Sequence, residues 1–362
     1  MNILIEARAL SAMSGGVKTY THELIANLVA LHPESSFELL YTANRLKGTF
    51  PTTKETTISL LSEALLPLWM SKIAAYANTK KPDIAHFTKA AIPRKKILPT
   101  IVTIYDIIPV LFPETQSPLR RLYWPLALKY AANNADHIMT ISDTSKRDIM
   151  KHFGIDENNI TVTPLAVDLQ YFRPSTPAGR SGQAPYILFV GTRDARKNIA
   201  SLIRAFARIA HQIPHQLVIA GRSAKKQDNS LQISRELGLE QRIEFREDVS
   251  YAQLPALYSN ADIFVWPSVY EGWGFPPQEA MACGTPVIVS DGGALPEVVG
   301  DAGVVVPLSE NFVEQLSHEM ISLIHDNARK QDLRERGLAR VQLFSWKSVA
   351  EKTWEVYKKI SV

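Results

Sequence analysis

The chain has 362 residues, more than a single hydrophobic core usually holds, and this length predicts two domains. Its 46% apolar and 21% charged residues are ordinary for a globular protein, and its single cysteine, Cys283, excludes an internal disulfide framework. A formal net charge of +4 permits an anionic substrate or a membrane surface but requires neither, and we expect no nucleic-acid partner.

The N-terminal residues do not have the features of a targeting segment. Residues 1–6 lack the basic start and the long apolar core of a signal peptide. No later stretch approaches the uninterrupted apolar length of a membrane span. Because one lone cysteine also suits a reducing compartment, we expect a cytoplasmic protein.

The first half alternates short apolar runs with amphipathic stretches, which predicts a parallel α/β domain. Residues 2–6 predict a strand, and a glycine turn then opens a helix that runs to residue 28. Gly15 and Gly16 would let the backbone approach a ligand closely, although a simple turn is the alternative. Further buried strands are predicted at residues 37–41, 83–87, 101–105, 135–142 and 161–168.

The stretch 60–76 is strongly apolar, and basic clusters follow it at residues 80–81 and 94–96. An apolar helix beside positive charge is able to lie on a lipid surface or to receive a lipid-linked acceptor. We favour core packing, because Pro67 interrupts the stretch and the basic residues are not on the same helix.

Asp106 follows the predicted strand 101–105 directly. Residues at the carboxyl ends of strands line the binding crevice of doubly wound sheets. Asp106 is therefore a candidate for the acceptor side of an active site.

Residues 174–185 are small, polar and rich in Pro, Gly and Ser, as is typical of a linker. We therefore predict an N-terminal domain at 1–172, a linker at 173–185 and a C-terminal domain at 186–343. The helical spacing of residues 344–357 predicts a terminal helix within 344–362.

Three cations, Arg193, Arg196 and Lys197, lie in the turn between the predicted strand 186–191 and the helix 199–209. Structural turns need Gly, Asn or Asp rather than clustered positive charge. A diphosphate would explain the cluster, since Arg binds phosphate oxygens with two parallel bonds and Lys acts as a point charge. The alternative is a solvated basic turn.

The central motif of the chain lies at residues 269–286, after the buried strand predicted at 261–266. Glu271 is expected in a loop rich in Gly and Pro, which includes Gly274 and Phe275, and Glu279 in the first turns of the following helix. The start of such a helix favours an anion, and carboxylates accept hydrogen bonds from sugar hydroxyls. A solvated loop Glu and an ordinary helical Glu are the alternative interpretation.

Glu271 and Glu279 with the residues between and after them resemble the E-x7-E signature of the family 4 retaining glycosyltransferases. The resemblance implies a GT-B fold, in which two doubly wound Rossmann-like domains face each other across a cleft and the terminal helix crosses back to the first domain. It also implies that Gly15 and Gly16 face the donor phosphates and that Lys197 with an Arg binds the diphosphate. Arg193 and Arg196 both remain candidates for that Arg. Many members have a His where this chain has Tyr105, so whether Tyr105 replaces it stays open.

By this resemblance, Glu279 accepts hydrogen bonds from the ribose and Glu271 from the donor sugar, in the transfer of a hexosyl group with retention. The catalytic candidates are Lys197, Arg193, Glu271 and Asp106. The candidates for donor binding are Gly15, Gly16, Arg193, Arg196, Lys197, Glu271, Gly274, Phe275 and Glu279. Because no Asp-x-Asp pair is found, no metal and no separate cofactor are expected, and protein cations would replace the metal.

The segments 5–10, 15–20 and 191–198 look most like bacterial mannosyltransferases of surface-polysaccharide and lipopolysaccharide biosynthesis. They imply GDP-mannose as donor and a glycan or lipid-linked oligosaccharide as acceptor, with contact at the inner face of the cell membrane. The alternatives are a UDP-sugar-dependent glycosyltransferase, a GT-B nucleotide-sugar epimerase or hydrolase, and a regulator that binds a nucleotide sugar without turnover.

Overall fold

The computed structural model describes residues 1–11, 15–42, 48–60, 65–95, 99–175, 184–224 and 228–361. The chain forms two compact units, one of Met1–Leu165 with Ser345–Val362 and one of Ala166–Phe344. No helix in the described ranges combines the length and the apolar character needed to cross a bilayer.

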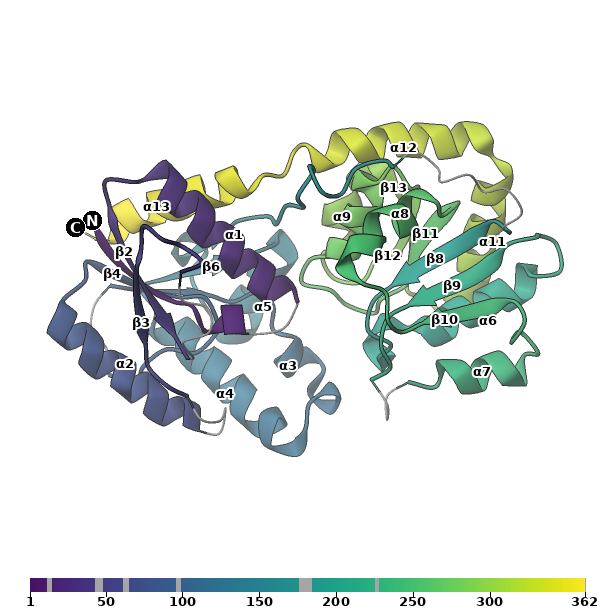
Figure 1. Ribbon diagram of the computed structural model, residues 1–362. Helices are drawn as coiled ribbons and strands as arrows, with labels where there is room; N and C mark the ends of the chain where they lie inside the picture. The colour runs from purple at the N-terminus through teal and green to yellow at the C-terminus, as the bar shows by residue number, and fades with distance from the viewer. Residues whose placement is uncertain are drawn as a thin grey trace. The chain divides into compact units, whose positions relative to one another are not determined.

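Among the described residues, the first unit contains a seven-stranded parallel sheet in the order β3-β2-β1-β4-β5-β6-β7 (Figure 1). The strands are β1 (Asn2–Glu6), β2 (Ser36–Tyr41), β3 (Lys54–Thr57), β4 (Ile84–Phe87), β5 (Thr100–Thr103), β6 (His137–Thr140) and β7 (Ile160–Val162). The order reverses between β1 and β4, as it does in doubly wound sheets. The short polar edge strand β3 has no apolar alternation, so the sequence pattern did not predict it.

Helices cover both faces of the first sheet. They are α1 (Gly16–Leu31), α2 (Leu66–Lys80), α3 (Ile108–Leu111), α4 (Pro118–Asn134), α5 (Asp143–Phe153) and α13 (Trp346–Ile360). Trp69 and Ile73 of α2 and Leu128 of α4 are buried with Val102 in one apolar core. Pro67 lies in the first turn of α2, where proline is tolerated, so within the apolar stretch 60–76 the helix begins only at Leu66.

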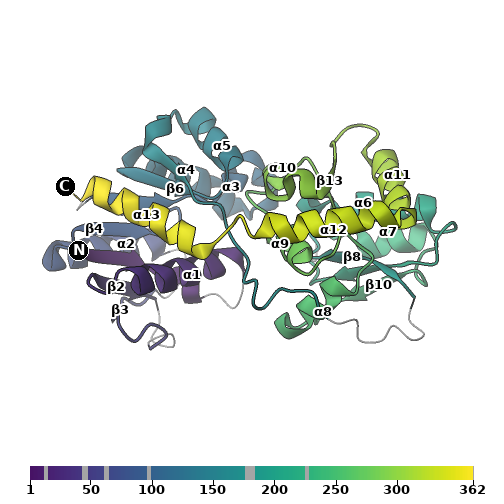
Figure 2. The same ribbon diagram turned by 90° about the horizontal axis from the view of Figure 1, so that it is seen from above.

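The C-terminal helix α13 belongs to the first unit and lies along α1 in both ribbon views (Figures 1 and 2). Its Tyr357 hydroxyl is 2.7 Å from Nδ1 of the buried His86 on β4. Nε2 of His86 lies 2.8 Å from the Thr103 hydroxyl, and burial lowers the pKa of His86 to about 3. A neutral histidine thus joins the terminal helix to the sheet.

The described part of the second unit contains a six-stranded parallel sheet in the order β10-β9-β8-β11-β12-β13. Its strands are β8 (Tyr186–Val190), β9 (Gln216–Ala220), β10 (Ile243–Arg246), β11 (Ile263–Trp266), β12 (Val287–Ser290) and β13 (Gly303–Val306). The order reverses between β8 and β11. The basic turn that precedes α6 (Ile199–Ile209) follows β8, and the start of the motif 269–286 follows β11.

The second sheet also has helices on both faces. Figure 1 shows α6 (Ile199–Ile209), α7 (Ser230–Glu236) and α11 (Phe312–His325) on one face, with α8 (Leu254–Ser259), α9 (Phe275–Ala282) and α12 (Asn327–Val341) on the other. A short helix α10 (Leu295–Val299) follows β12. This arrangement and the first sheet together confirm two Rossmann-like α/β domains.

The boundary between the units differs from the predicted one at residue 172. Tyr171 stacks on Tyr251 with ring centroids 4.5 Å apart, and Phe172 is buried edge-on to Tyr258. These aromatic contacts attach 166–172 to the second unit. Most of the predicted linker 173–185 lies outside the described residues, which stop at 175 and resume at 184.

Candidate active site

The loops after β8 and β11 are joined by backbone contacts. The Val269 N–H donates to the Arg196 carbonyl at 2.8 Å, and the Ser268 hydroxyl donates to the same oxygen at 3.1 Å. The strand order reverses between these two strands, so their loops lie at the sheet edge where doubly wound folds bind ligands. Sequence analysis missed Ser268, whose only signal was its position two residues after β11.

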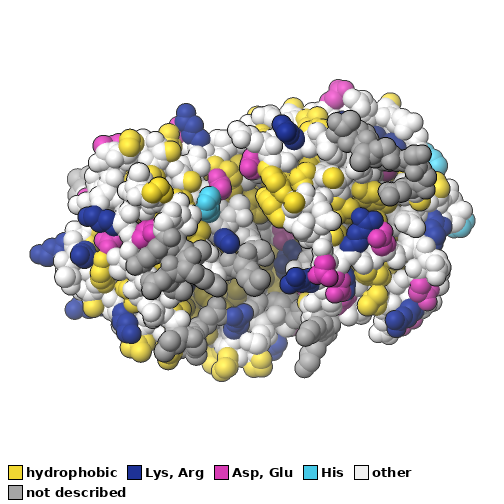
Figure 3. Space-filling model, in the orientation of Figure 1, with side chains coloured by type: hydrophobic (Ala, Val, Ile, Leu, Met, Phe, Trp, Pro, Cys, Tyr) yellow, Lys and Arg dark blue, Asp and Glu magenta, His cyan; other side chains and the backbone are white. Residues whose placement is uncertain are grey.

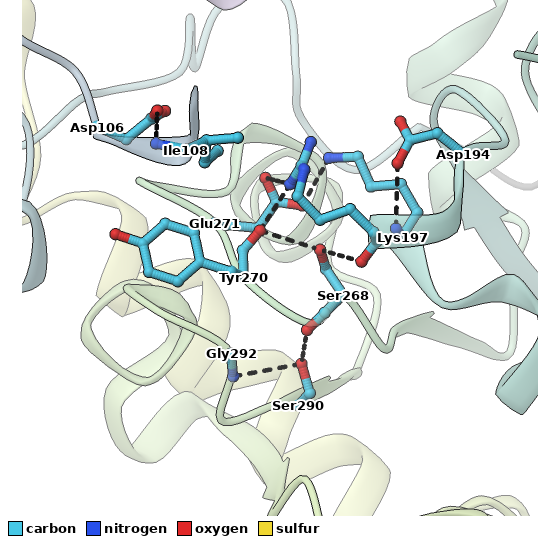
Figure 4. A network of polar contacts seen from close by, with 10 residues as sticks. Asp106, Ile108, Asp194, Lys197, Ser268, Tyr270, Glu271, Ser290 and Gly292 are labelled. Atoms are coloured by element: carbon cyan, nitrogen blue, oxygen red, sulfur yellow. Dashed lines mark hydrogen bonds and ion pairs between the residues drawn. The ribbon is translucent and has the colours of Figure 1, made fainter. Parts of the chain in front are cut away.

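Glu271 lies between the two cations of the first loop. The Lys197 ammonium is 2.5 Å from Oε1 of Glu271, and Nη1 of Arg196 is 3.0 Å from Oε2 (Figure 4). All three side chains are at most 15% exposed. The Lys197 ammonium also lies 4.6 Å from the centre of the Trp266 ring. The structure therefore brings together three predicted site residues in one cluster, with two positive charges and one negative charge.

The charge state of Glu271 follows from this arrangement. Burial raises the pKa of a carboxyl, but the charges of Lys197 and Arg196 more than offset it, so the pKa of Glu271 lies below its ordinary value. Glu271 is ionised at neutral pH. Its carboxylate is ready to accept hydrogen bonds, and it keeps both cations in place.

A capped turn positions the two cations. Asp194 caps the 3₁₀ turn Ala195–Lys197, its carboxylate accepting from the Lys197 N–H at 3.3 Å. Asn198 then adopts a left-handed conformation with φ of 54°, and α6 begins directly after it. Asn tolerates this conformation better than most residues. Nη1 of Arg196 also donates to the Tyr270 carbonyl at 2.6 Å, which ties the turn to the Glu271 loop.

Arg193, the other candidate for the diphosphate, does not belong to this cluster. Its guanidinium donates to Asp228 at 2.8 Å, to Glu247 at 2.5 Å and to the Gly221 carbonyl at 2.9 Å. The side chain is only 1% exposed. All three guanidinium nitrogens of Arg193 already donate hydrogen bonds within the protein, so Arg193 is a structural residue. Arg196 is the arginine beside Lys197.

The loop after β12 supports the backbone of Glu271. The Ala294 N–H donates to the Glu271 carbonyl at 2.9 Å, and the Glu271 N–H donates to the Gly292 carbonyl at 3.3 Å. A Cβ on Gly293 would lie 2.3 Å from the Glu271 carbonyl oxygen, and its φ of +68° also favours glycine. The Ser290 hydroxyl donates to the Ser268 carbonyl (Figure 4). Gly292 and Gly293 thus determine the backbone position of Glu271.

Glu279 lies in α9 and has a different environment from Glu271. It accepts a hydrogen bond from the buried Tyr258 hydroxyl at 2.7 Å. Burial raises the pKa of the Glu279 carboxyl to about 7. Near neutral pH, Glu271 is therefore ionised, whereas Glu279 is partly protonated. Tyr258 was not identified from the sequence, because nothing in its own segment indicates a polar partner.

The start of α9 offers less to an anion than the sequence suggested. Gly274 is the residue before the helix, and Phe275 is its first residue. Pro276 and Pro277 follow and have no N–H groups to donate. The cations of the loop after β8, rather than this helix start, are the strongest anion-binding groups of the cluster.

The predicted residues of the first unit lie at the carboxyl edge of its own sheet. Gly15 has φ of +120° directly before α1, which begins at Gly16. Asp106 accepts a hydrogen bond from the Ile108 N–H at 2.9 Å (Figure 4). The Tyr105 hydroxyl donates to the Thr88 carbonyl at 2.7 Å, and burial raises its pKa well above the ordinary value. Tyr105 therefore does not offer a titratable group in place of a histidine.

Across the described ranges, no three His, Cys, Asp or Glu side chains gather closely enough to hold a metal ion. Positive charge at the cluster around Glu271 comes from Arg196 and Lys197.

Two family models cover most of the chain. Residues 14–171 match the model described as Glycosyltransferase Family 4, and residues 176–340 match Glycosyl transferases group 1. The O-antigen chain mannosyltransferase B of Escherichia coli is 32% identical over 268 residues, which are 71% of this chain and 70% of that protein. The chain is a family 4 glycosyltransferase.

Other similarities agree with this assignment. The MMP alpha-(1->4)-mannosyltransferase of Mycolicibacterium hassiacum is 32% identical over 64% of this chain and 56% of its own length. Sucrose-phosphate synthase from Thermosynechococcus elongatus has a TM-score of 0.78 at 22% identity, covering 99% of this chain and 98% of its own. HepE from Anabaena in complex with UDP-glucose has a TM-score of 0.76 at 17% identity, covering 99% of this chain and 100% of its own. The glycosyltransferase thus has the GT-B fold predicted from its sequence.

Proposed function

We propose that this glycosyltransferase moves a hexosyl group from a nucleotide sugar to an acceptor hydroxyl with retention at the anomeric carbon. The observation that carries the proposal is the cluster of Lys197, Arg196 and Glu271 at the point where the strand order of the second sheet reverses. Solved relatives of this fold bind UDP and UDP-glucose. The cluster has the net positive charge that a nucleotide diphosphate requires.

In the proposed reaction, the donor diphosphate takes over the contacts that Lys197 and Arg196 make with Glu271. The sugar–phosphate bond breaks through an oxocarbenium-like transition state, and negative charge grows on the departing diphosphate. Two fixed cations stabilise that charge more than the ground state, which lowers the barrier. Protein cations then fulfil the role of a metal ion.

Once the diphosphate pairs with the cations, Glu271 is free to accept hydrogen bonds from hydroxyls of the donor sugar. Glu279 is proposed to accept hydrogen bonds from the ribose hydroxyls of the donor. A front-face route, in which the donor phosphate takes the acceptor proton, accounts for retention without a covalent enzyme nucleophile. Gly15, Gly16 and Asp106 are proposed to face the reacting sugar and the acceptor, and Gly274 and Phe275 the donor.

GDP-mannose is the proposed donor. The support is similarity to the E. coli O-antigen chain mannosyltransferase B and to the Salmonella typhimurium O-antigen chain mannosyltransferase RfbU, which is 31% identical over 57% of this chain and 56% of its own length. The proposed acceptor is a glycan or lipid-linked oligosaccharide of surface-polysaccharide biosynthesis, handled at the inner face of the cell membrane.

The test begins with donor binding. GDP-mannose, GDP-glucose, UDP-glucose and UDP-galactose are compared by thermal shift, where a ligand at a hundred times its Kd stabilises the protein by about 2.7 kcal/mol. The bound donor is then incubated with lipid-linked oligosaccharide extracts, and the anomeric configuration of the product is read by NMR. If a UDP-sugar stabilises the protein and GDP-mannose does not, the UDP-sugar becomes the proposed donor. Donor consumption without an acceptor supports an epimerase or hydrolase, and an inverted product overturns the retaining mechanism.

A further inference from the structure

Five exposed leucines cluster on the first unit. On α4, Leu119, Leu122 and Leu126 are 85%, 71% and 63% exposed. They recur at the spacing of one helix face, and Leu128 and Ala131 on the opposite face are buried in the core. The fold therefore already uses the other side of α4, and folding gives no reason for this apolar face.

Leu68 of α2 and Leu65 directly before this helix add two more leucines, at 57% and 43% exposure. An apolar groove of about 670 Å³ lies between α2 and α4, with Leu68 and Met70 on one side, Leu126 and Tyr130 on the other, and Ile92 also lining it. We call these five leucines and the groove the leucine surface. Figure 3 shows yellow side chains along this lower edge of the first unit, with Lys and Arg among them. Sequence analysis considered residues 60–76 but did not identify α4.

The charged side chains of the two helices have one sign. Within the described residues of α2 and α4, no Asp or Glu occurs. The cations of the two helices all lie on exposed positions, namely Lys72, Lys80, Arg120, Arg121 and Lys129. Arg94, which lines the groove, adds another. Exposed apolar side chains surrounded by cations match an anionic, apolar partner.

We propose that the leucine surface docks the protein on an anionic lipid bilayer, with the leucines inserted at the headgroup boundary and the cations on lipid phosphates. A second copy of this chain fits poorly, because a symmetric contact would place these cations against one another. The inference deepens the proposed membrane contact of the glycosyltransferase, but it does not depend on which donor the protein uses.

The first test is flotation of the full chain with vesicles of phosphatidylcholine alone and with 30% phosphatidylglycerol, a composition on the order of an anionic membrane surface. We expect binding only to the anionic vesicles, and its loss at high salt. Equal binding to both vesicle types, or none to either, overturns the proposal.

The second test locates the contact. Leu119→Ser, Leu122→Ser and Leu126→Ser together should weaken binding to anionic vesicles about tenfold or more, because apolar insertion is lost. The matched control replaces three exposed leucines of the second unit, Leu231, Leu237 and Leu343, with serine. Arg120→Gln with Arg121→Gln should also weaken binding, whereas Arg204→Gln with Arg235→Gln should not. Equal effects in both units overturn the assigned surface.

Two further measurements separate the alternatives. Nucleotide-sugar thermal shifts should be the same for the leucine variant and the wild type, so a failed donor test does not affect the docking result. Sedimentation velocity reports the oligomeric state without vesicles. A dimer that the leucine substitutions dissociate would assign the leucine surface to a second copy of the chain and overturn lipid docking.

Discussion

The Lys197 ammonium lies 2.5 Å from the Glu271 carboxylate, and these residues come from loops that follow two different strands. The ion pair joins the loops after β8 and β11, and Arg196 contacts the other carboxylate oxygen. A buried carboxylate thus holds two cations side by side before any diphosphate arrives. The repulsion between the two cations is offset by Glu271 within the folded protein, so ligand binding does not have to overcome it.

Replacing Lys197 with Met should lower kcat about 100- to 1,000-fold, because one fixed charge on the leaving group is lost. Glu271 loses one of its two cations but keeps Arg196, so the loss of stability should be smaller than for removal of its whole charge partner. Steady-state kinetics with the donor found by thermal shift measures the effect. Arg196→Gln should act in the same direction, and an unchanged kcat in both variants would remove the leaving-group role.

Arg193→Met should have the opposite profile. It leaves the Asp228 carboxylate, whose side chain is only 5% exposed, without its cation. Removing one partner of a buried pair costs about 3–5 kcal/mol, so the urea midpoint should fall. Asp228→Asn in the same chain should restore part of the loss. The reverse result, full stability with weak donor binding, would return Arg193 to the donor site.

The sequence predicted the two sheets well because buried parallel strands are continuous apolar runs, as in residues 186–190 and 263–266. The Glu271 and Glu279 pair was found for a similar reason, since strand, loop and helix follow one another within 269–286. Both features are local in the chain. The strand β3 was missed because it is polar, and β13 was missed although its three valines form an apolar run.

The choice between Arg193 and Arg196 could not be made from the sequence. The two residues share one turn and one side-chain chemistry, and their difference lies in partners far along the chain. Arg193 reaches Asp228 and Glu247, whereas Arg196 reaches Glu271. Likewise, the raised pKa of Glu279 depends on burial, which no single segment encodes.

The glycine at 293 should be required for the position of Glu271. In Gly293→Ala the new Cβ would lie 2.3 Å from the Glu271 carbonyl oxygen, so the loop must move. We expect donor affinity to fall about tenfold or more, since small displacements of positioning groups are costly. Gly238→Ala is the matched control, because Gly238 has a similar φ of +64° and open space around its Cα. If Gly293→Ala and Gly238→Ala bind donor equally well, Gly293 does not position Glu271. Any change in stability would then come from backbone strain alone.

The raised pKa of Glu279 predicts how stability depends on pH. The folded-state pKa of about 7 lies above the ordinary value of 4.5, so the folded protein holds this proton more tightly than the unfolded chain. The stabilisation is fully present below pH 4.5 and is lost as pH rises towards 7. Its upper limit is about 3 kcal/mol, because a tenfold change in proton affinity corresponds to about 1.36 kcal/mol. Glu279→Gln cannot ionise and should lack this dependence.

Urea unfolding of wild type and Glu279→Gln at intervals from pH 4.5 to 8 measures the difference directly, and other titrating groups cancel between the two proteins. The gap in unfolding free energy should change with pH up to about 7 and then stay constant as Glu279 becomes ionised throughout. Tyr258→Phe supplies a second check. It removes the hydrogen bond that favours the carboxylate, so the pKa of Glu279 should rise further and the constant region should begin at higher pH. A gap that is flat across the whole range would place Glu279 in contact with water rather than buried against Tyr258.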